Sequence, residues 1–425
     1  MKVFFDTVGC RLNQSEIERM AREFRFAGHT IVGSMNEADL VVVNTCSVTS
    51  QAASDSRQKI RQAARISPRA QIIATGCWAT LEPDAAAALS EYTRVVLNDK
   101  KDELAGNFLG FDYAAMDLSL IERETLPGTR HRTRAFIKVQ DGCDAFCTFC
   151  VTRIARGKSR GEPVDRILAD VQSALAGGAK EIVLTGVQLG SWGKHFSEPK
   201  NLSELVRLIL GEADVPRLRF SSIEPWDMDA EFFRLFDDRR ICRHLHIAIQ
   251  SGSAATLKRM GRRITPSEFM MLLDQARQID DNFAITTDVI AGFPGETLAE
   301  FEESLDFIQK AAFSGGHVFP YSARQGTPAA SFPDQVQSKE RKIRAARVRD
   351  VLAESTKHYQ LCQVGKTVQV LWEVARPQDG GYILDGFCEN YVKVRAFSRE
   401  KRINCIDSVH LEGVTTSAIS GDICP

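Results

Sequence analysis

The pattern of apolar and polar positions divides the chain into three regions. In the first hundred residues, short apolar runs alternate with helical stretches, two of them at residues 15–28 and 51–66. The runs that predict strands are residues 2–9, 38–45, 71–76 and 93–98. Strand and helix in alternation imply parallel strands, so this region is predicted to form an open α/β sheet.

A second and longer series of strands and helices begins at about residue 134. Six apolar segments predict its strands, at residues 135–140, 181–187, 217–224, 244–251, 283–293 and 316–322. Apolar residues at helical spacing in 164–175 predict one of the helices between them. Since eight such units usually need about 250 residues, six units indicate a partial (β/α)6 barrel, with its catalytic rim where the strands end.

The third region follows a charged helix predicted at residues 335–359. Its segments 367–374, 381–387 and 391–397 alternate apolar and polar residues between turns, which predicts a small antiparallel β-barrel or sheet. The predicted domains are therefore an N-terminal α/β domain, a linker, a barrel and a β domain. Their ranges are 1–108, 109–133, 134–358 and 360–425.

Composition and charge restrict the possible location and partners of the protein. The 425 residues suffice for two to four domains. The apolar runs are far shorter than the roughly 20 residues of a membrane span, and the N-terminus lacks a signal-peptide core. We therefore expect a cytoplasmic protein without a membrane partner. The net charge of −1 does not favour a nucleic-acid partner, so any such partner must bind local patches.

Cysteine is the residue type that points to chemistry. Eleven cysteines, an odd number without an export signal, argue against a disulfide framework and for metal ligation or catalysis. Cys10, Cys46 and Cys77 each lie just beyond the end of a predicted strand, at the edge where open α/β sheets bind ligands. They are a candidate metal site; the alternative is that they are small buried apolar side chains.

The strongest motif is the C-x3-C-x2-C spacing of Cys143, Cys147 and Cys150. Three thiolates at this spacing suit a 4Fe–4S cluster, and the absence of a fourth cysteine leaves one iron open for chemistry. A zinc site, the alternative, would need a fourth Cys or His in the loop, and none is present. No GxSxG, Walker A or HExxH motif occurs, which argues against the usual hydrolases and NTPases.

This cysteine loop resembles that of the radical S-adenosylmethionine (SAM) superfamily. The resemblance implies that SAM binds the open iron and that an electron from the cluster cleaves it to a 5′-deoxyadenosyl radical. An electron donor of flavodoxin or ferredoxin type is implied with it. Phe149 matches the aromatic position that packs near the adenine of SAM in that superfamily.

Further motifs resemble the methylthiotransferase family across nearly the whole chain. They are TVGCRLN, NTCSVT, ATGC, DGCDAFCTFCVTRIARGKSR, TGVQLGSWG, SSIEP, HLHIAIQSGS, TTDVIAGFPGETLAEF and HVFPYSARQGTPA. The family's layout is an N-terminal three-cysteine domain, a radical SAM barrel and a C-terminal TRAM β-barrel. The resemblance implies that Cys10, Cys46 and Cys77 bind an auxiliary 4Fe–4S cluster.

The first two motifs are most similar to the branch that acts on threonylcarbamoyladenosine next to the tRNA anticodon, at position 37. The resemblance implies two SAM molecules for each product. One methylates a sulfur associated with the auxiliary cluster. The other yields the radical that abstracts hydrogen from carbon 2 of the adenine, to which the methylthio group is then transferred. The alternative acceptors are isopentenyladenosine in tRNA and a ribosomal-protein aspartate. An alternative of another class is a non-catalytic iron–sulfur protein that binds RNA and senses redox state.

Candidate residues for binding SAM lie at the ends of predicted strands, and candidate residues for binding RNA lie in basic runs. For SAM, the candidates at strand ends are Thr185, Gly186, Ser222, Glu224, Gln250 and Gly292, together with Phe149. Glu224 could accept from a ribose hydroxyl or an ammonium group; the alternative is a salt bridge with an arginine such as Arg219. For the tRNA anticodon stem-loop, the candidates are Arg153, Arg156, Lys158, Arg160, Lys393 and Arg395, with the run 258–263 as a further basic patch. Such runs are otherwise solvated or structural faces.

Overall fold

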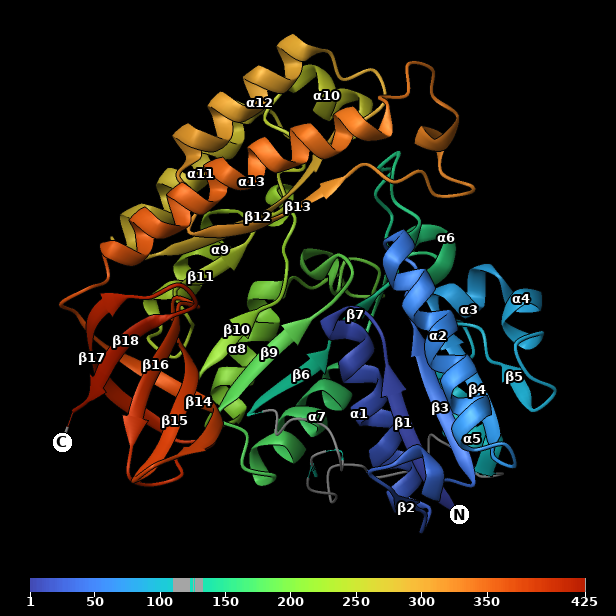
Figure 1. Cartoon of the computed structure of the whole chain (residues 1–425). Helices are drawn as coiled ribbons and strands as arrows, with labels where there is room; N and C mark the ends of the chain where they lie inside the picture. Colours follow the sequence, from blue (N-terminus) through green and yellow to red (C-terminus); the bar gives the residue numbers. More distant parts are fainter. Residues whose placement is uncertain (110–122, 125, 127–132, 425) are drawn as a thin grey trace. The chain divides into compact units, whose positions relative to one another are not determined.

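The computed structural model describes residues 1–109, 123–124, 126 and 133–424, so most of the predicted linker 109–133 lies outside the described residues. The chain divides into two compact units (Figure 1). Unit 1 comprises Met1–Ala145, Cys150–Lys200 and Gly211–Ala213, and unit 2 comprises Phe146–Phe149, Asn201–Leu210 and Asp214–Pro425. No helix of the described residues is long and apolar enough to cross a membrane.

Unit 1 contains the predicted open sheet. Its five parallel strands lie in the order β2 (Thr30–Ile31), β1 (Lys2–Thr7), β3 (Leu40–Thr45), β4 (Gln71–Gly76) and β5 (Thr93–Val95). Every residue of the central strand β3 is buried, as expected when helices cover both faces of a parallel sheet. Val42 packs in one apolar core with α1 (Arg11–Phe26), and Val43 packs in another with α2 (Ser50–Ile66).

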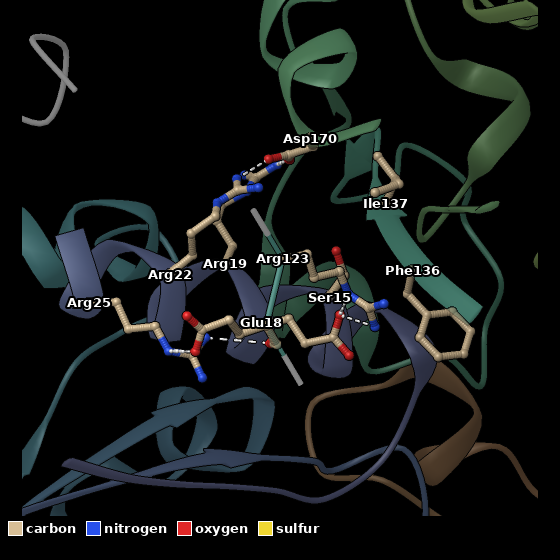
Figure 2. A pocket seen from close by; sticks show the side chains of 10 residues that line it. Ser15, Glu18, Arg19, Arg22, Arg25, Arg123, Phe136, Ile137 and Asp170 are labelled. Atoms are coloured by element: carbon tan, nitrogen blue, oxygen red, sulfur yellow. Dashed lines mark hydrogen bonds and ion pairs between the residues drawn. The ribbon is translucent and has the colours of Figure 1, made fainter. Parts of the chain in front are cut away.

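The first two barrel strands also belong to unit 1. Strands β6 (Arg134–Lys138) and β9 (Glu181–Thr185) pair in parallel, joined by a segment that contains α6 (Thr152–Arg156) and α7 (Val164–Ala176). Figure 2 shows the pocket lined by α1, β6 and α7, where Arg19 and Arg22 of α1 reach Asp170 of α7. The arginines of this pocket are paired with carboxylates, so they join elements rather than offer free charge.

Unit 2 continues the series with β10 (Leu218–Phe220) and a parallel sheet in the order β11 (His244–His246), β12 (Ala284–Ala291) and β13 (Gly315–Pro320). The helices α11 (Pro266–Ile279), α12 (Leu298–Ala311) and α13 (Ser338–Leu361) run along one side of this sheet (Figure 1). Both α11 and α12 begin with a capping box, from Thr265 and Thr297, which fixes where each helix starts. The six predicted barrel strands are thus all present.

The C-terminal region is a closed barrel in the order β14–β15–β16–β18–β17. Its strands are β14 (Thr367–Gln378), β15 (Gly381–Cys388), β16 (Lys393–Ser398), β17 (Ile406–Val414) and β18 (Ile419–Ile423). The prediction of a small β-barrel is confirmed, with one correction: β16 and β18 pair in parallel, because the last strand inserts between β16 and β17 to close the barrel. Strands β17 and β18 were not among the predicted segments.

Candidate functional site: two cysteine sites and their buried arginines

Three cysteines lie along one edge of the open sheet in unit 1. Cys10 caps the start of α1 three residues after β1, Cys46 directly follows β3, and Cys77 directly follows β4 as the first residue of α3 (Cys77–Leu81). Strands β1, β3 and β4 are neighbours in this parallel sheet, so their carboxyl ends meet at the same edge. The structure therefore brings the three predicted ligands to one place.

The backbone around these cysteines is closely fitted. Gly9 has a φ of +106°, and a Cβ atom there would lie 2.6 Å from the sulfur of Cys46, so only glycine lets the loop pass over that sulfur. Asn13 lies 3.7 Å from the Cys10 sulfur, and the amide of Asn98 lies 3.9 Å from the Cys77 sulfur. Each of these two sulfurs therefore has a polar side chain near it.

The donor set of three cysteine thiols matches the ligands of a 4Fe–4S cluster. Burial raises the pKa of the Cys46 thiol to about 11, whereas Cys10 is exposed. Among the described residues, no three His, Cys, Asp or Glu side chains are placed to hold one ion. In a 4Fe–4S cluster each cysteine binds its own iron, so the sulfurs stand further apart than around one zinc ion.

Arg156 lies behind this edge in a buried ionic network, and its predicted contact with RNA is corrected. Its guanidinium donates to Glu16 (2.8 Å), Asp141 (2.9 Å) and Asn13 (2.7 Å), and the residue is only 4% exposed. Lys101 donates to the same Glu16 at 2.7 Å. These carboxylates come from distant parts of the sequence, so no local pattern reveals that Arg156 is internal.

The other three basic residues of this segment lie nearer the surface. Arg153 is half-buried and Lys158 is exposed. Arg160 pairs with Asp141 at 2.9 Å, and its side chain is 42% exposed. Lys158 is therefore the member of this group best placed to meet a phosphate.

Unit 1 holds two cysteines of the C-x3-C-x2-C motif, Cys143 and Cys150, both half-buried. The Cys143 amide donates to the carbonyl of Gly157 at 3.1 Å, and its thiol lies 3.3 Å from the side-chain oxygen of Gln188. At the end of β9, the hydroxyl of Thr185 is buried and has no partner among the described residues. Gly186 follows, where a Cβ atom would lie 2.9 Å from Gln140 Oε1. The unpaired hydroxyl of Thr185, next to the closely packed Gly186, could therefore hydrogen-bond to a polar ligand.

The third cysteine of the motif, Cys147, belongs to unit 2 and contacts a buried arginine there. Arg262 Nη1 donates to the Cys147 sulfur at 3.7 Å, while Nη2 lies 2.6 Å from Glu224 Oε2. The guanidinium also stacks over Trp226, 4.6 Å from the ring centre. The Arg262 side chain is 1% exposed, whereas that of Glu224 is 23% exposed. Arg262 thus joins a motif cysteine to a candidate SAM ligand.

The sequence does not predict this role for Arg262. The salt bridge to an arginine that we considered for Glu224 is present, but its partner is Arg262 and not Arg219. The run 258–263 was interpreted as a surface patch, although its fifth residue points inward. Arg219 does not reach Glu224: it donates to the carbonyl of Glu389 at 2.9 Å and stacks on Tyr391. Nothing in the sequence of the run distinguishes buried Arg262 from its exposed neighbour Arg263.

The remaining predicted SAM positions of unit 2 lie in different surroundings. Phe149 is half-buried and packs edge-on against Phe293, in a core with Ile290. Gln250 has a φ of +72° and pairs with β12 through its backbone, which fixes where its side chain starts. Ser222 is exposed.

Gly292 lies close to the chain's own α13. It has a φ of +73°, and a Cβ atom there would lie 2.3 Å from Cγ of Arg341. On this side of the backbone, the close approach that glycine permits is between helix and strand. A role of the Gly292 backbone in binding SAM stays a prediction.

The β-barrel presents the last two predicted RNA residues on β16. Arg395 pairs with Asp385 at 2.8 Å, and Arg376 pairs with the same carboxylate at 2.6 Å. Lys393 is half-buried on the same strand. Two arginines share one aspartate, so this part of the barrel keeps a positive excess.

Comparison with known proteins identifies the family. Two family models match: "Uncharacterized protein family UPF0004" at residues 2–98 and "Radical SAM superfamily" at residues 137–308. The "Threonylcarbamoyladenosine tRNA methylthiotransferase MtaB" of Thermotoga maritima is 37% identical over 403 residues, covering 92% of this chain and 90% of its own. The protein of the same name from Bacillus subtilis is 35% identical, covering 96% and 93%. A "tRNA-2-methylthio-N(6)-dimethylallyladenosine synthase" of Staphylococcus haemolyticus is 30% identical, covering 98% and 83%.

Solved structures agree on the fold. The radical SAM methyltransferase TsrM from Kitasatospora setae superposes with a TM-score of 0.55 at 18% identity, covering 77% of this chain and 75% of its own. At this identity the likeness concerns architecture alone. The family models and the relatives go further, and they confirm the resemblance found in the motifs. The chain therefore belongs to the radical SAM methylthiotransferases, enzymes that use SAM and two 4Fe–4S clusters.

Proposed function

We propose that the protein transfers a methylthio group to carbon 2 of N6-threonylcarbamoyladenosine at position 37 of tRNA. The observation that carries this proposal is the set of relatives named for that acceptor, at 31–37% identity over nearly the whole chain. Relatives named for dimethylallyladenosine follow at 29–30%. The substrate would be the anticodon stem-loop, and the place of action would be the cytoplasm, where tRNA is modified.

The two cysteine sites would hold the two clusters. We assign the radical SAM cluster to Cys143, Cys147 and Cys150, and the auxiliary cluster to Cys10, Cys46 and Cys77 in a domain of residues 1–108. When bound, the clusters and SAM supply the radical and the sulfur chemistry, with electrons from a flavodoxin- or ferredoxin-type donor. The chain itself supplies thiolate ligands, a fitted backbone over Cys46, and a buried cation beside Cys147.

The protein's remaining part is to orient SAM and the RNA. Glu224, held by Arg262, keeps an exposed edge that can accept from a ribose hydroxyl or an ammonium group. Thr185 offers a hydroxyl without a partner among the described residues. We propose Thr185, Gly186, Phe149, Ser222, Glu224 and Gln250 for SAM, and Arg153, Lys158, Arg160, Lys393 and Arg395 for RNA phosphates.

Mass spectrometry of nucleosides from digested tRNA tests the proposal directly. Cells with and without the gene are compared, and the strain without it is complemented as a control. We expect the 2-methylthio form of threonylcarbamoyladenosine to disappear while its precursor accumulates. Loss of the dimethylallyl product instead would overturn the acceptor. If every tRNA nucleoside is unchanged, the tRNA assignment fails, and ribosomal proteins should then be examined for a missing methylthio group.

A further inference from the structure

The sheet β11–β12–β13 carries polar side chains on one face. Thr286, Asp288 and Ile290 alternate along β12 and so point to the same side. The parallel register sets His246 beside Thr286, His317 beside Asp288 and Phe319 beside Ile290. The intervening residues Val289 and Ala291 are buried. We call the row His246, Asp288 and His317 the polar strip.

His246 is held in the polar strip by a hydrogen bond to Thr286 and a close contact with Asp288. Its Nε2 lies 3.2 Å from Asp288 Oδ2, and its Nδ1 lies 2.9 Å from the hydroxyl of Thr286. The same hydroxyl lies 3.0 Å from Nε2 of His244, whose ring stacks on Tyr391 of the β-barrel. Both ring nitrogens of His246 therefore have a polar neighbour, and one oxygen of Asp288 lies next to the imidazole.

One carboxylate oxygen of Asp288, Oδ1, has no hydrogen-bond donor among the described residues. This oxygen is buried, although the side chain as a whole is 29% exposed. A buried carboxylate oxygen without a donor is costly, so such groups in native proteins usually await a ligand or an ordered water. The site therefore favours a ligand that brings an N–H or O–H group.

His317 stands next to Asp288 with its ring exposed. Its ring centre is 6.3 Å from that of His246 and 6.3 Å from that of Phe319, which is itself 38% exposed. In the described part of the chain, no hydrogen-bond partner occupies the nitrogens of His317. An exposed imidazole beside an exposed phenyl ring can donate to an anionic group while the phenyl ring packs on a base.

The polar strip also lies close to a position expected to contact SAM. Ile290, two residues beyond Asp288 on the same face, packs in one core with Phe149. Two residues along a strand span about 7 Å. SAM held beside Phe149 would therefore lie near the polar strip, and a substrate adenine placed next to SAM for reaction at carbon 2 could direct its N6 substituent towards Asp288 and His317.

We propose that the polar strip binds the threonylcarbamoyl substituent of the substrate, and that His317 selects this substituent over an isoprenoid one. The inference rests on the proposed function and names the source of its specificity. The threonylcarbamoyl group has ureido N–H and hydroxyl donors for Asp288 Oδ1. Its carboxylate must lie away from Asp288, at the imidazole of His317, because like charges repel. A dimethylallyl group would leave both protein groups unpaired, which polar sites reject strongly.

Binding of anticodon stem-loop RNA to the cluster-loaded enzyme tests this inference without relying on turnover. Three RNAs are compared by fluorescence anisotropy, carrying adenosine, threonylcarbamoyladenosine or isopentenyladenosine at position 37. The variants are His317→Leu, His317→Gln and, as a matched control, His358→Leu, an exposed histidine on α13. Iron content and SAM cleavage without RNA confirm that each variant is loaded.

We expect His317→Leu to weaken binding of the threonylcarbamoyl RNA about tenfold or more, with the adenosine RNA unchanged. His317→Gln keeps a donor and should retain most of the preference, and His358→Leu should resemble the wild type. Equal affinities of His317→Leu and wild type for the threonylcarbamoyl RNA would overturn the inference, as would an equal loss for all three RNAs. If wild-type enzyme methylthiolates only the isopentenyl RNA, the proposed function fails instead.

Discussion

Each unit buries one arginine beside cysteine chemistry, and the two arginines are neutralised in different ways. In unit 1, Arg156 is enclosed by Glu16, Asp141 and Asn13. In unit 2, Arg262 pairs with the carboxylate of Glu224 and also donates to a cysteine sulfur. The first arginine is part of a closed ionic network, whereas the second shares its charge with a sulfur and a partly exposed acid.

The two arginines also differ in the state of the carboxylates beside them, Glu16 in unit 1 and Glu224 in unit 2. Burial alone would raise the pKa of Glu16, but Arg156, Lys101 and Lys138 hold that pKa well below its usual range. Glu16 is therefore ionised and wholly committed to its neighbours. Glu224 keeps an exposed edge and one cation. A closed network builds a scaffold, while an open pair leaves charge available to a ligand.

The largest effects should come from the cysteines themselves. Cys143→Ala should abolish cleavage of SAM to 5′-deoxyadenosine, since it removes a ligand of the radical SAM cluster. Cys46→Ala should spare some cleavage but stop methylthio transfer, since it removes a ligand of the auxiliary cluster. Chromatography of nucleosides from anaerobic reactions measures both products. The reverse pattern would refute the assignment of the two sites.

The second-largest effect should come from the ionic network around Arg156. Arg156→Ala strands two ionised carboxylates in the interior, and breaking a buried pair in this way costs about 3–5 kcal/mol. We expect the free energy of unfolding, from urea titration followed by circular dichroism, to fall by that amount. Lys158→Ala, two residues away and exposed, should change it by less than about 1 kcal/mol. A loss for Arg156→Ala no larger than for this control would show that the network is not a scaffold.

The open pair should act on the cluster rather than on the fold. Arg262→Leu removes a positive charge and a hydrogen bond from the Cys147 sulfur, and both favour the reduced cluster. The midpoint potential of the radical SAM cluster, from an EPR-monitored titration, should fall by on the order of tens of millivolts. Arg262→Lys should recover part of this shift, and Arg263→Leu, an exposed neighbour, should cause none. An unchanged potential in Arg262→Leu would leave Arg262 a purely structural role.

The smallest effect concerns a second acid of α1. Burial raises the pKa of Glu23 to about 8, although Arg19 opposes the shift. A carboxyl with a raised folded pKa stabilises the protein fully below its unfolded value near 4.5, and this stabilisation is lost as the pH rises towards 8. Glu23→Gln should flatten the decline of Tm between pH 5 and 8 by a few degrees. Parallel curves for variant and wild type would contradict this.

The sequence by itself predicted most of the strands, the cysteine motif and the family of this protein. Residues 38–45 and 71–76 are predicted as strands because a short apolar run bounded by turns is typical of a buried strand. A cysteine directly follows each of the two segments. The C-x3-C-x2-C spacing and the motifs around it were local, so they indicated cluster chemistry and family without a fold. The weakly alternating sequence of β17 and β18 was the part of the architecture that local pattern did not reveal.

Only the tertiary structure decided which charges meet. Arg156 and Glu16 are 140 residues apart in sequence, and Arg262 pairs with Glu224 where Arg219 was expected. The polar strip depends on the register of β11, β12 and β13, which sets His246 and His317 on either side of Asp288's strand. Periodicity and spacing describe neighbours along the chain. Ion pairs and strand register join residues that become neighbours only when the chain folds, so no local pattern contains them.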